Sequence, residues 1–237
     1  YGNHARDVEG LDDTRGAAML TEGTIQKIEI PRVPIVGELR VMVLLVDFPD
    51  KVGHVSPSHF HDLLFSAGIH PTGSMRDFYA EISHGRVNVT GSVHGWLRLP
   101  QRSSFYANAE SGMKWGSYPR NAQRMAEDAV QAALREGIPF DQHLDKLGQG
   151  IVTALFIVHA GRGAEELHES IAGSEIWSHK WALRAPIKVG PDLFASIYLT
   201  VPEDCKVGVC AHELGHLAFQ WQDFYDADGK GKNGIIW

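Results

Sequence analysis

The sequence predicts an α+β fold in which helices pack on a mixed, twisted sheet. Two nearly continuous apolar segments, 38–48 and 151–160, have the length and the branched side chains of strands buried on both faces. Segments with helical periodicity alternate with such strands along the chain. The last expected strand leads directly into an amphipathic helix at 207–219.

Capping residues, helical periodicity and terminal glycines predict three further helices. Residues 58–67 predict a helix capped by Ser56 or Ser58. Residues 74–85 begin with a serine, place four large apolar side chains on one helical face and stop at a glycine. Residues 119–137 predict a long helix that begins with proline and ends with glycine.

The remaining strands are expected at 86–99, 175–181 and 193–201. Residues 86–99 alternate apolar and polar side chains around two glycines, which predicts a hairpin or a bent pair of strands. The segments at 175–181 and 193–201 are short and rich in aromatic or branched residues, as strands are.

Composition and charge restrict the class of protein. With 237 residues, 43% hydrophobic and 22% charged, the chain is typical of a globular protein. A net charge of −7 and the absence of a dense basic run argue against nucleic-acid binding. No apolar run approaches the roughly 18 residues that a membrane span needs. Residues 1–34 are polar and aperiodic, so we interpret them as an N-terminal arm or pro-segment remnant before one domain at 35–237.

The helix at 207–219 contains a His-Glu-x-x-His motif. His212 and His216 lie one helical turn apart, so both imidazoles can reach one Zn²⁺ ion. Glu213 faces the rim of such a site, where its carboxylate can take a proton from a zinc-activated water. The surrounding apolar residues predict a buried helix, and Gly215 predicts a close approach to its backbone.

A third metal ligand must come from outside this helix. If the helix continued, Asp223 would lie about 10.5 Å beyond His216 and could not reach the ion. The chain must therefore turn back near residues 219–222, which contain neither glycine nor proline. We choose Asp223 as the ligand, with Asp226 and Asp228 as competitors.

The chain has two cysteines, Cys205 and Cys210. In an exported protein they could form a disulfide across a short loop, whereas a cytosolic protein would keep them reduced. Zinc binding by this pair is disfavoured because Cys210 precedes His212 by only two positions.

Several motifs together resemble the immune inhibitor A family of secreted zinc metallopeptidases. They occur in the order expected of that family's catalytic domain and span about residues 35–230: "VMVLLVDFPDK" (41–51), "GSMRDFYAEISHGRVNVTGSVHGW" (73–96), "IVHAGRGAE" (157–165), "EIWSHKW" (175–181) and "HELGHLAFQWQDFYD" (212–226). The resemblance implies a zincin-like catalytic domain at 35–237, one catalytic Zn²⁺ ion and secretion.

The resemblance also assigns roles to individual residues. His212 and His216 stand at the family's zinc-binding histidines and Glu213 at its catalytic glutamate. The family pattern usually continues with glycine and then aspartate, but here Phe219 replaces the glycine and Asp223 comes one position late. We interpret this as a longer variant of the same turn. Related zinc peptidases carry a methionine turn beneath the metal, downstream of the third ligand. Because no methionine follows Met125 here, we also expect the chain to end before the family's C-terminal part.

Two further expectations concern the surroundings of the metal. His179 and Tyr225 are candidate transition-state helpers, although a structural role for His179 is the more frequent case. An extended peptide substrate is expected to pair with an edge strand, either 175–181 or 193–201. Relatives look calcium-loop-like at 141–150, but only Asp141 and Asp145 remain as carboxylates here, so little or no calcium is expected.

The leading hypothesis is a zinc-dependent metalloendopeptidase that acts on protein or peptide substrates. A non-catalytic binding module with the same fold is one alternative, but such a module has no chemical need for Glu213. A zinc hydrolase of non-peptide substrates is another.

Overall fold

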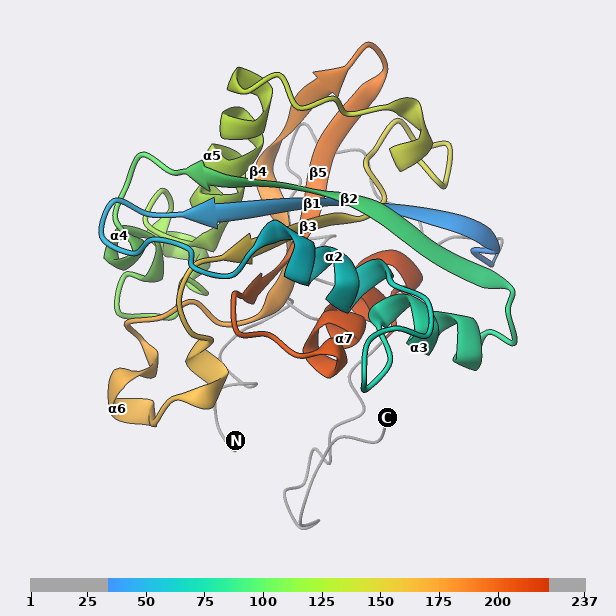
Figure 1. The fold of residues 1–237 in the computed structure, drawn as a ribbon. Coiled ribbons are helices and arrows are strands. Elements are labelled where there is room, and N and C mark those ends of the chain that lie inside the picture. The colour runs from blue at the N-terminus through green and yellow to red at the C-terminus, as the bar shows by residue number, and fades with distance from the viewer. Residues whose placement is uncertain (1–33, 222–237) are drawn as a thin grey trace.

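A computed structural model describes residues 34–221. In this part of the chain five strands form one mixed sheet in the order β2-β1-β3-β5-β4 (Figure 1). Four strands run parallel and β4 pairs antiparallel with β5: β1 (Gly37–Asp47), β2 (Val87–Arg98), β3 (Leu155–His159), β4 (His179–Gly190) and β5 (Leu193–Pro202). The predicted mixed fold of helices and a sheet is therefore confirmed.

The central strand β1 separates two apolar cores. Successive side chains of a strand point to opposite faces, so its alternate residues enter different cores. Leu39, Val41, Val43 and Leu45 belong to one core, and Met42, Leu44 and Val46 belong to the other. This two-sided burial explains why the segment is almost continuously apolar.

Helices cover both faces of this sheet. Helices α2 (Pro57–Phe65), α3 (Met75–Ile82) and α7 (Val207–Phe219) contribute to one core, and α4 (Ser103–Ala107) and α5 (Ala122–Arg135) contribute to the other. Figure 1 shows α2, α3 and α7 gathered on one side of β1 and β2, and α5 on the other. Short helical segments complete the described part: η2 (Trp115–Ser117), η3 (Gln142–Leu144), η4 (Ala164–Glu166) and α6 (Glu169–Ala172).

Side-chain caps fix where the helices begin. Ser56 accepts a hydrogen bond from the His59 N–H and caps α2, so the choice between Ser56 and Ser58 falls on Ser56. Ser74 and Asp77 form a reciprocal capping box at α3. Helix α5 begins at Ala122 rather than at residue 119, because the Asn121 side chain accepts from the backbone of its first turn.

The prediction of a hairpin or a strand pair at 86–99 is wrong, because these residues form the single strand β2. Its two glycines allow close packing instead of turns. A Cβ atom at Gly91 would lie 2.4 Å from the Val41 carbonyl oxygen, and one at Gly95 would lie 2.3 Å from the Leu45 carbonyl oxygen. Gly95 also has a φ of +118° next to an irregularity in the β1–β2 register, which favours glycine there.

The strand expected at 175–181 begins only at His179. Strand β5 lies inside the sheet, so β4 is the edge strand on this side. Of the two strands considered for substrate binding, only β4 lies at an edge of the sheet that the described strands form. No helix in the described part is both long and apolar enough to cross a membrane. The N-terminal arm expected at 1–34 lies almost entirely outside the described residues.

Tyr79 connects α3 to α7. Its side chain is 1% exposed and its hydroxyl donates a 2.7 Å hydrogen bond to the Ala211 carbonyl oxygen. Its ring stacks on Phe219, with centroids 5.1 Å apart. This contact holds α7 against the helices that cover the same face of the sheet.

We expect Tyr79→Phe to lower the free energy of unfolding by about 1 kcal/mol, because it removes a buried hydrogen bond and keeps the ring. Urea denaturation measures this difference. Tyr118→Phe is the matched control, since Tyr118 is half-buried and donates to a Glu127 carboxylate that water can solvate instead. Equal losses in the two variants would contradict a special role for the Tyr79 contact.

Candidate metal centre

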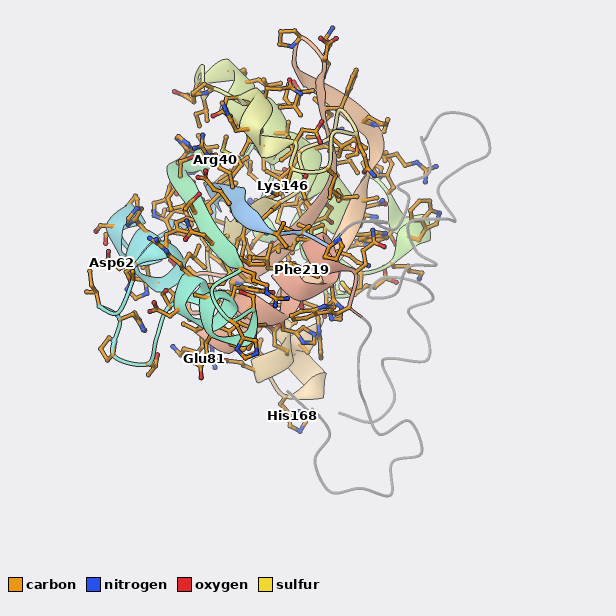
Figure 2. The ribbon with its side chains drawn as sticks, turned by 90° about the vertical axis from the view of Figure 1, so that its right-hand side faces the viewer. Arg40, Asp62, Glu81, Lys146, His168 and Phe219 are labelled. Carbon is orange, nitrogen blue, oxygen red and sulfur yellow. The ribbon has the colours of Figure 1, made fainter. Side chains whose placement is uncertain are left out.

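The motif helix α7 spans Val207–Phe219, as the sequence predicts. It follows β5 after a short connection and packs under the sheet, and Phe219 marks its C-terminal end in Figure 2. Most of its side chains are buried, including Cys210, Glu213, Leu214, His216 and Leu217. Polar groups in such surroundings need partners, which indicates a function for the histidines.

The imidazoles of His212 and His216 converge. Their Nε2 atoms lie 2.9 Å apart, and the rings are nearly perpendicular at an angle of 89°. Two nitrogens bound tetrahedrally to one zinc ion at about 2.0–2.1 Å lie about 3.3 Å from each other. The observed arrangement is therefore close to that of two ligands of one ion. Glu213 belongs to the same helical turn and is only 4% exposed.

A hydrogen bond sets the tautomer of His216. Its Nδ1 lies 2.6 Å from the Trp221 carbonyl oxygen. A carbonyl only accepts, so Nδ1 carries the proton and the lone pair of Nε2 faces His212. Metal-binding histidines commonly have a partner of this kind on their second nitrogen.

The chain reverses direction after α7 without a glycine. Gln220 ends the helix with a φ of +56°, and its N–H donates to the Gly215 carbonyl oxygen. The Trp221 N–H donates to the same oxygen at 3.2 Å. A Cβ atom at Gly215 would lie only 2.5 Å from the Trp221 ring. This confirms the close approach expected at Gly215. The Trp221 ring occupies the space that a side chain at this position would need.

The remaining ligand candidates lie outside the described residues. Asp223, Tyr225, Asp226 and Asp228 all follow Trp221. Within residues 34–221 no cluster of three His, Cys, Asp or Glu side chains is suited to a metal ion. The identity of the third ligand and the role of Tyr225 therefore stay predictions.

His179 is buried at the beginning of β4 with both ring nitrogens engaged. Its Nδ1–H donates to the Trp177 carbonyl oxygen at 2.6 Å, and its Nε2 accepts from the Tyr198 hydroxyl at 3.1 Å. Burial lowers the pKa of His179 to about 4, so the ring is neutral near pH 7. These contacts support a structural role, and its role as a transition-state helper stays a prediction.

His159, for which the sequence predicts no role, is a second buried histidine of the sheet. It ends β3 and is 1% exposed. Burial lowers its pKa to about 3. In the sequence His159 is recognisable as a histidine at the end of an otherwise apolar strand. Periodicity alone assigns no chemical role to such a residue.

The structure brings Cys205 and Cys210 together. Their sulfur atoms lie 3.5 Å apart in the form of free thiols, and both residues are buried. The expected disulfide stays a prediction on this evidence.

The loop at 141–150 uses its carboxylates internally. Asp145 accepts from the N–H groups of Gln149 and Gly150, and Asp141 accepts from the His143 N–H. A hollow of about 320 Å³ beside this loop is lined in part by Arg40 and Lys146, both labelled in Figure 2. Glu38 and Asp145 line it as well, and the expectation of little or no calcium at this loop stays a prediction.

The burial of His179 predicts a dependence of stability on pH. Its folded pKa of about 4 lies below the ordinary value of 6.5, so the unfolded chain binds the proton first as the pH falls. Stability from this group is complete above pH 6.5 and decreases as the pH falls toward 4. Between pH 7 and pH 5 the expected loss is about 2 kcal/mol.

Urea unfolding of wild type and His179→Gln at both pH values measures this contribution, because the variant lacks the titrating group. His61→Gln, at an exposed histidine, is the control and should keep the wild-type dependence. Parallel pH profiles for wild type and His179→Gln would contradict the assignment.

Comparison with known proteins agrees with this geometry. Residues 33–237 match the family described as "Immune inhibitor A peptidase M6, catalytic domain". Immune inhibitor A of Bacillus thuringiensis subsp. alesti is 28% identical over 238 residues, covering 81% of this chain and 34% of that protein. Pre-pro-metalloprotease PrtV of Vibrio cholerae serotype O1 (strain M66-2) is 27% identical over 222 residues, covering 75% of this chain and 24% of that protein.

The chain therefore spans about a third of the first relative and about a quarter of the second. The family match includes every described helix and strand and the His-Glu-x-x-His motif. On this evidence the chain belongs to the immune inhibitor A peptidase M6 family of metallopeptidases.

Proposed function

We propose that the chain is a zinc-dependent endopeptidase in which His212, His216 and Asp223 hold the metal and Glu213 is the general base. The observation that carries this proposal is the convergence of the two Nε2 atoms at 2.9 Å, with a buried glutamate in the same helical turn. A protein that only bound a partner through this fold would have no chemical need for that carboxylate.

The turn after α7 supports Asp223 as the third ligand. A continued helix would carry Asp223 too far from the two histidines to share a metal ion with them. The helix ends at Phe219 and the chain leaves helical geometry at Gln220, so this objection does not apply. The Trp221 carbonyl oxygen already lies 2.6 Å from His216 Nδ1. Asp223 follows two residues later, a span of at most about 7 Å of extended chain. Asp226 is five residues from Trp221, so it would need a further fold of the chain.

Each of these side chains has a defined task in peptide hydrolysis. A bound zinc ion supplies Lewis acidity, which makes water nucleophilic near neutral pH and polarises the scissile carbonyl. Glu213 accepts the proton of the attacking water and then passes it to the leaving amine. The hydrogen bond to the Trp221 carbonyl keeps the His216 ring oriented while these protons move.

The substrates in this proposal are proteins or peptides bound in extended form. Among the described residues, β4 is the outermost strand on its side of the sheet and pairs antiparallel with β5, which is the position where a peptide would add through backbone hydrogen bonds. Such binding gives affinity with little dependence on sequence. We further propose that the protein works outside the cell, on the basis of its family resemblance.

Glu213→Gln is expected to lower the rate of casein cleavage by about 10²–10⁴-fold, because the amide cannot accept the proton. Zinc content, measured on the same samples by atomic emission, should stay at the wild-type level. Glu166→Gln, at an exposed glutamate, is the matched control and should cleave normally. Equal cleavage by wild type and Glu213→Gln would exclude the mechanism, and zinc binding without cleavage in wild type would favour a binding module.

The third ligand is tested by Asp223→Asn and Asp226→Asn in the full chain. Loss of a direct ligand should weaken zinc binding more than the 10–100-fold typical of a lost supporting hydrogen bond. Competition with a chromogenic chelator measures that affinity. We expect the large loss in Asp223→Asn alone, and the reverse result would assign the ligand to Asp226.

A further inference from the structure

We propose that Cys205 and Cys210 form an intramolecular disulfide that closes the entry to the motif helix. This inference does not depend on the proposed peptidase activity, because it concerns only the oxidation state of the two sulfurs and the stability of α7.

The two thiols are placed to pair with each other. Their Sγ atoms lie 3.5 Å apart, and a disulfide bond of about 2.05 Å requires them to approach by roughly 1.5 Å. Within residues 1–237 each of these cysteines is the other's single possible partner. Cys205 is 7% exposed and Cys210 is fully buried, which blocks pairing with a second copy of the chain.

The backbone around the pair is already fixed. The Cys205 N–H donates to the Pro202 carbonyl oxygen at 3.1 Å, in the turn that ends β5. The Cys210 N–H donates to the Lys206 carbonyl oxygen at 3.2 Å, which is the first hydrogen bond of α7. A bond between the sulfurs would therefore enclose the connection and the first helical turn in one covalent ring.

The beginning of α7 lacks the usual reinforcements of a helix N-terminus. Lys206 makes no side-chain capping bond, and no acidic residue lies in the first turn. Gly208 lies in that turn, and a Cβ atom there would meet nothing within 4 Å. A covalent constraint at this point restricts the unfolded chain and compensates for the missing cap.

The oxidation needs an external disulfide, such as oxidised glutathione. The thiolate of Cys205, the more exposed of the two, attacks one glutathione sulfur and releases the first molecule of reduced glutathione. The Cys210 thiolate then attacks the Cys205 sulfur of the mixed disulfide and releases the second. Two protons and two electrons pass from the cysteine pair to the oxidised glutathione.

The sequence allows a direct test in the full chain. Trypsin cleaves after Lys188, Lys206 and Lys230, so Cys205 and Cys210 fall on the separate peptides 189–206 and 207–230. Protein is equilibrated with oxidised glutathione, alkylated under denaturing conditions and digested without reductant. We expect the two peptides to remain linked, with no alkylated cysteine, and to separate when reductant is added. Two alkylated, separate peptides would overturn the proposal.

Thermal unfolding tests the stabilising role. The oxidised protein should have a Tm about 4–8 °C above that of the reduced protein, from the loop entropy of a short ring in a domain of this size. The Cys205→Ala and Cys210→Ala variants should show no change with reductant. Because the comparison of oxidised and reduced wild type uses no variant, a folding defect in either variant does not affect it. Equal Tm values for linked and reduced wild type would exclude the stabilising role.

Discussion

The burial of β1 on both faces is the constraint on which the rest of the fold depends. A strand whose alternate residues enter two different cores needs helices on both sides of the sheet. Helix α7 covers one of these two sides, together with α2 and α3. His212, Glu213 and His216 therefore lie on a helix that packing holds in place, which would reduce the entropy lost on binding the proposed metal.

The second constraint is the reversal of the chain at Gln220. The left-handed conformation of this residue lets Trp221 fold back over Gly215, where a larger residue would not fit. The same reversal brings the Trp221 carbonyl to His216 and fixes the proton on Nδ1. The turn is thus made by a glutamine, and Gly215, five residues before Gln220, leaves room for the Trp221 ring.

The two ends of α7 are built in different ways. Its C-terminal end is tied by hydrogen bonds to Gly215 and by aromatic stacking of Phe219 on Tyr79. Its N-terminal end has no cap, and a pair of buried thiols lies there instead. An oxidised pair would add a covalent restraint at the N-terminal end of the motif helix.

The sequence by itself determined the features that depend on local periodicity and spacing. The limits of α7, the burial of β1 and the pairing of His212 with His216 follow from which side chains share a face. Only the tertiary structure decided the role of the glycines of β2. A side chain at Gly91 or Gly95 would collide with backbone atoms of β1, and that contact does not follow from their neighbours in sequence. The tertiary structure also decided that β4 is the edge strand and that Gln220 makes the turn, since both depend on contacts between segments far apart or on a conformation that the residue type does not favour.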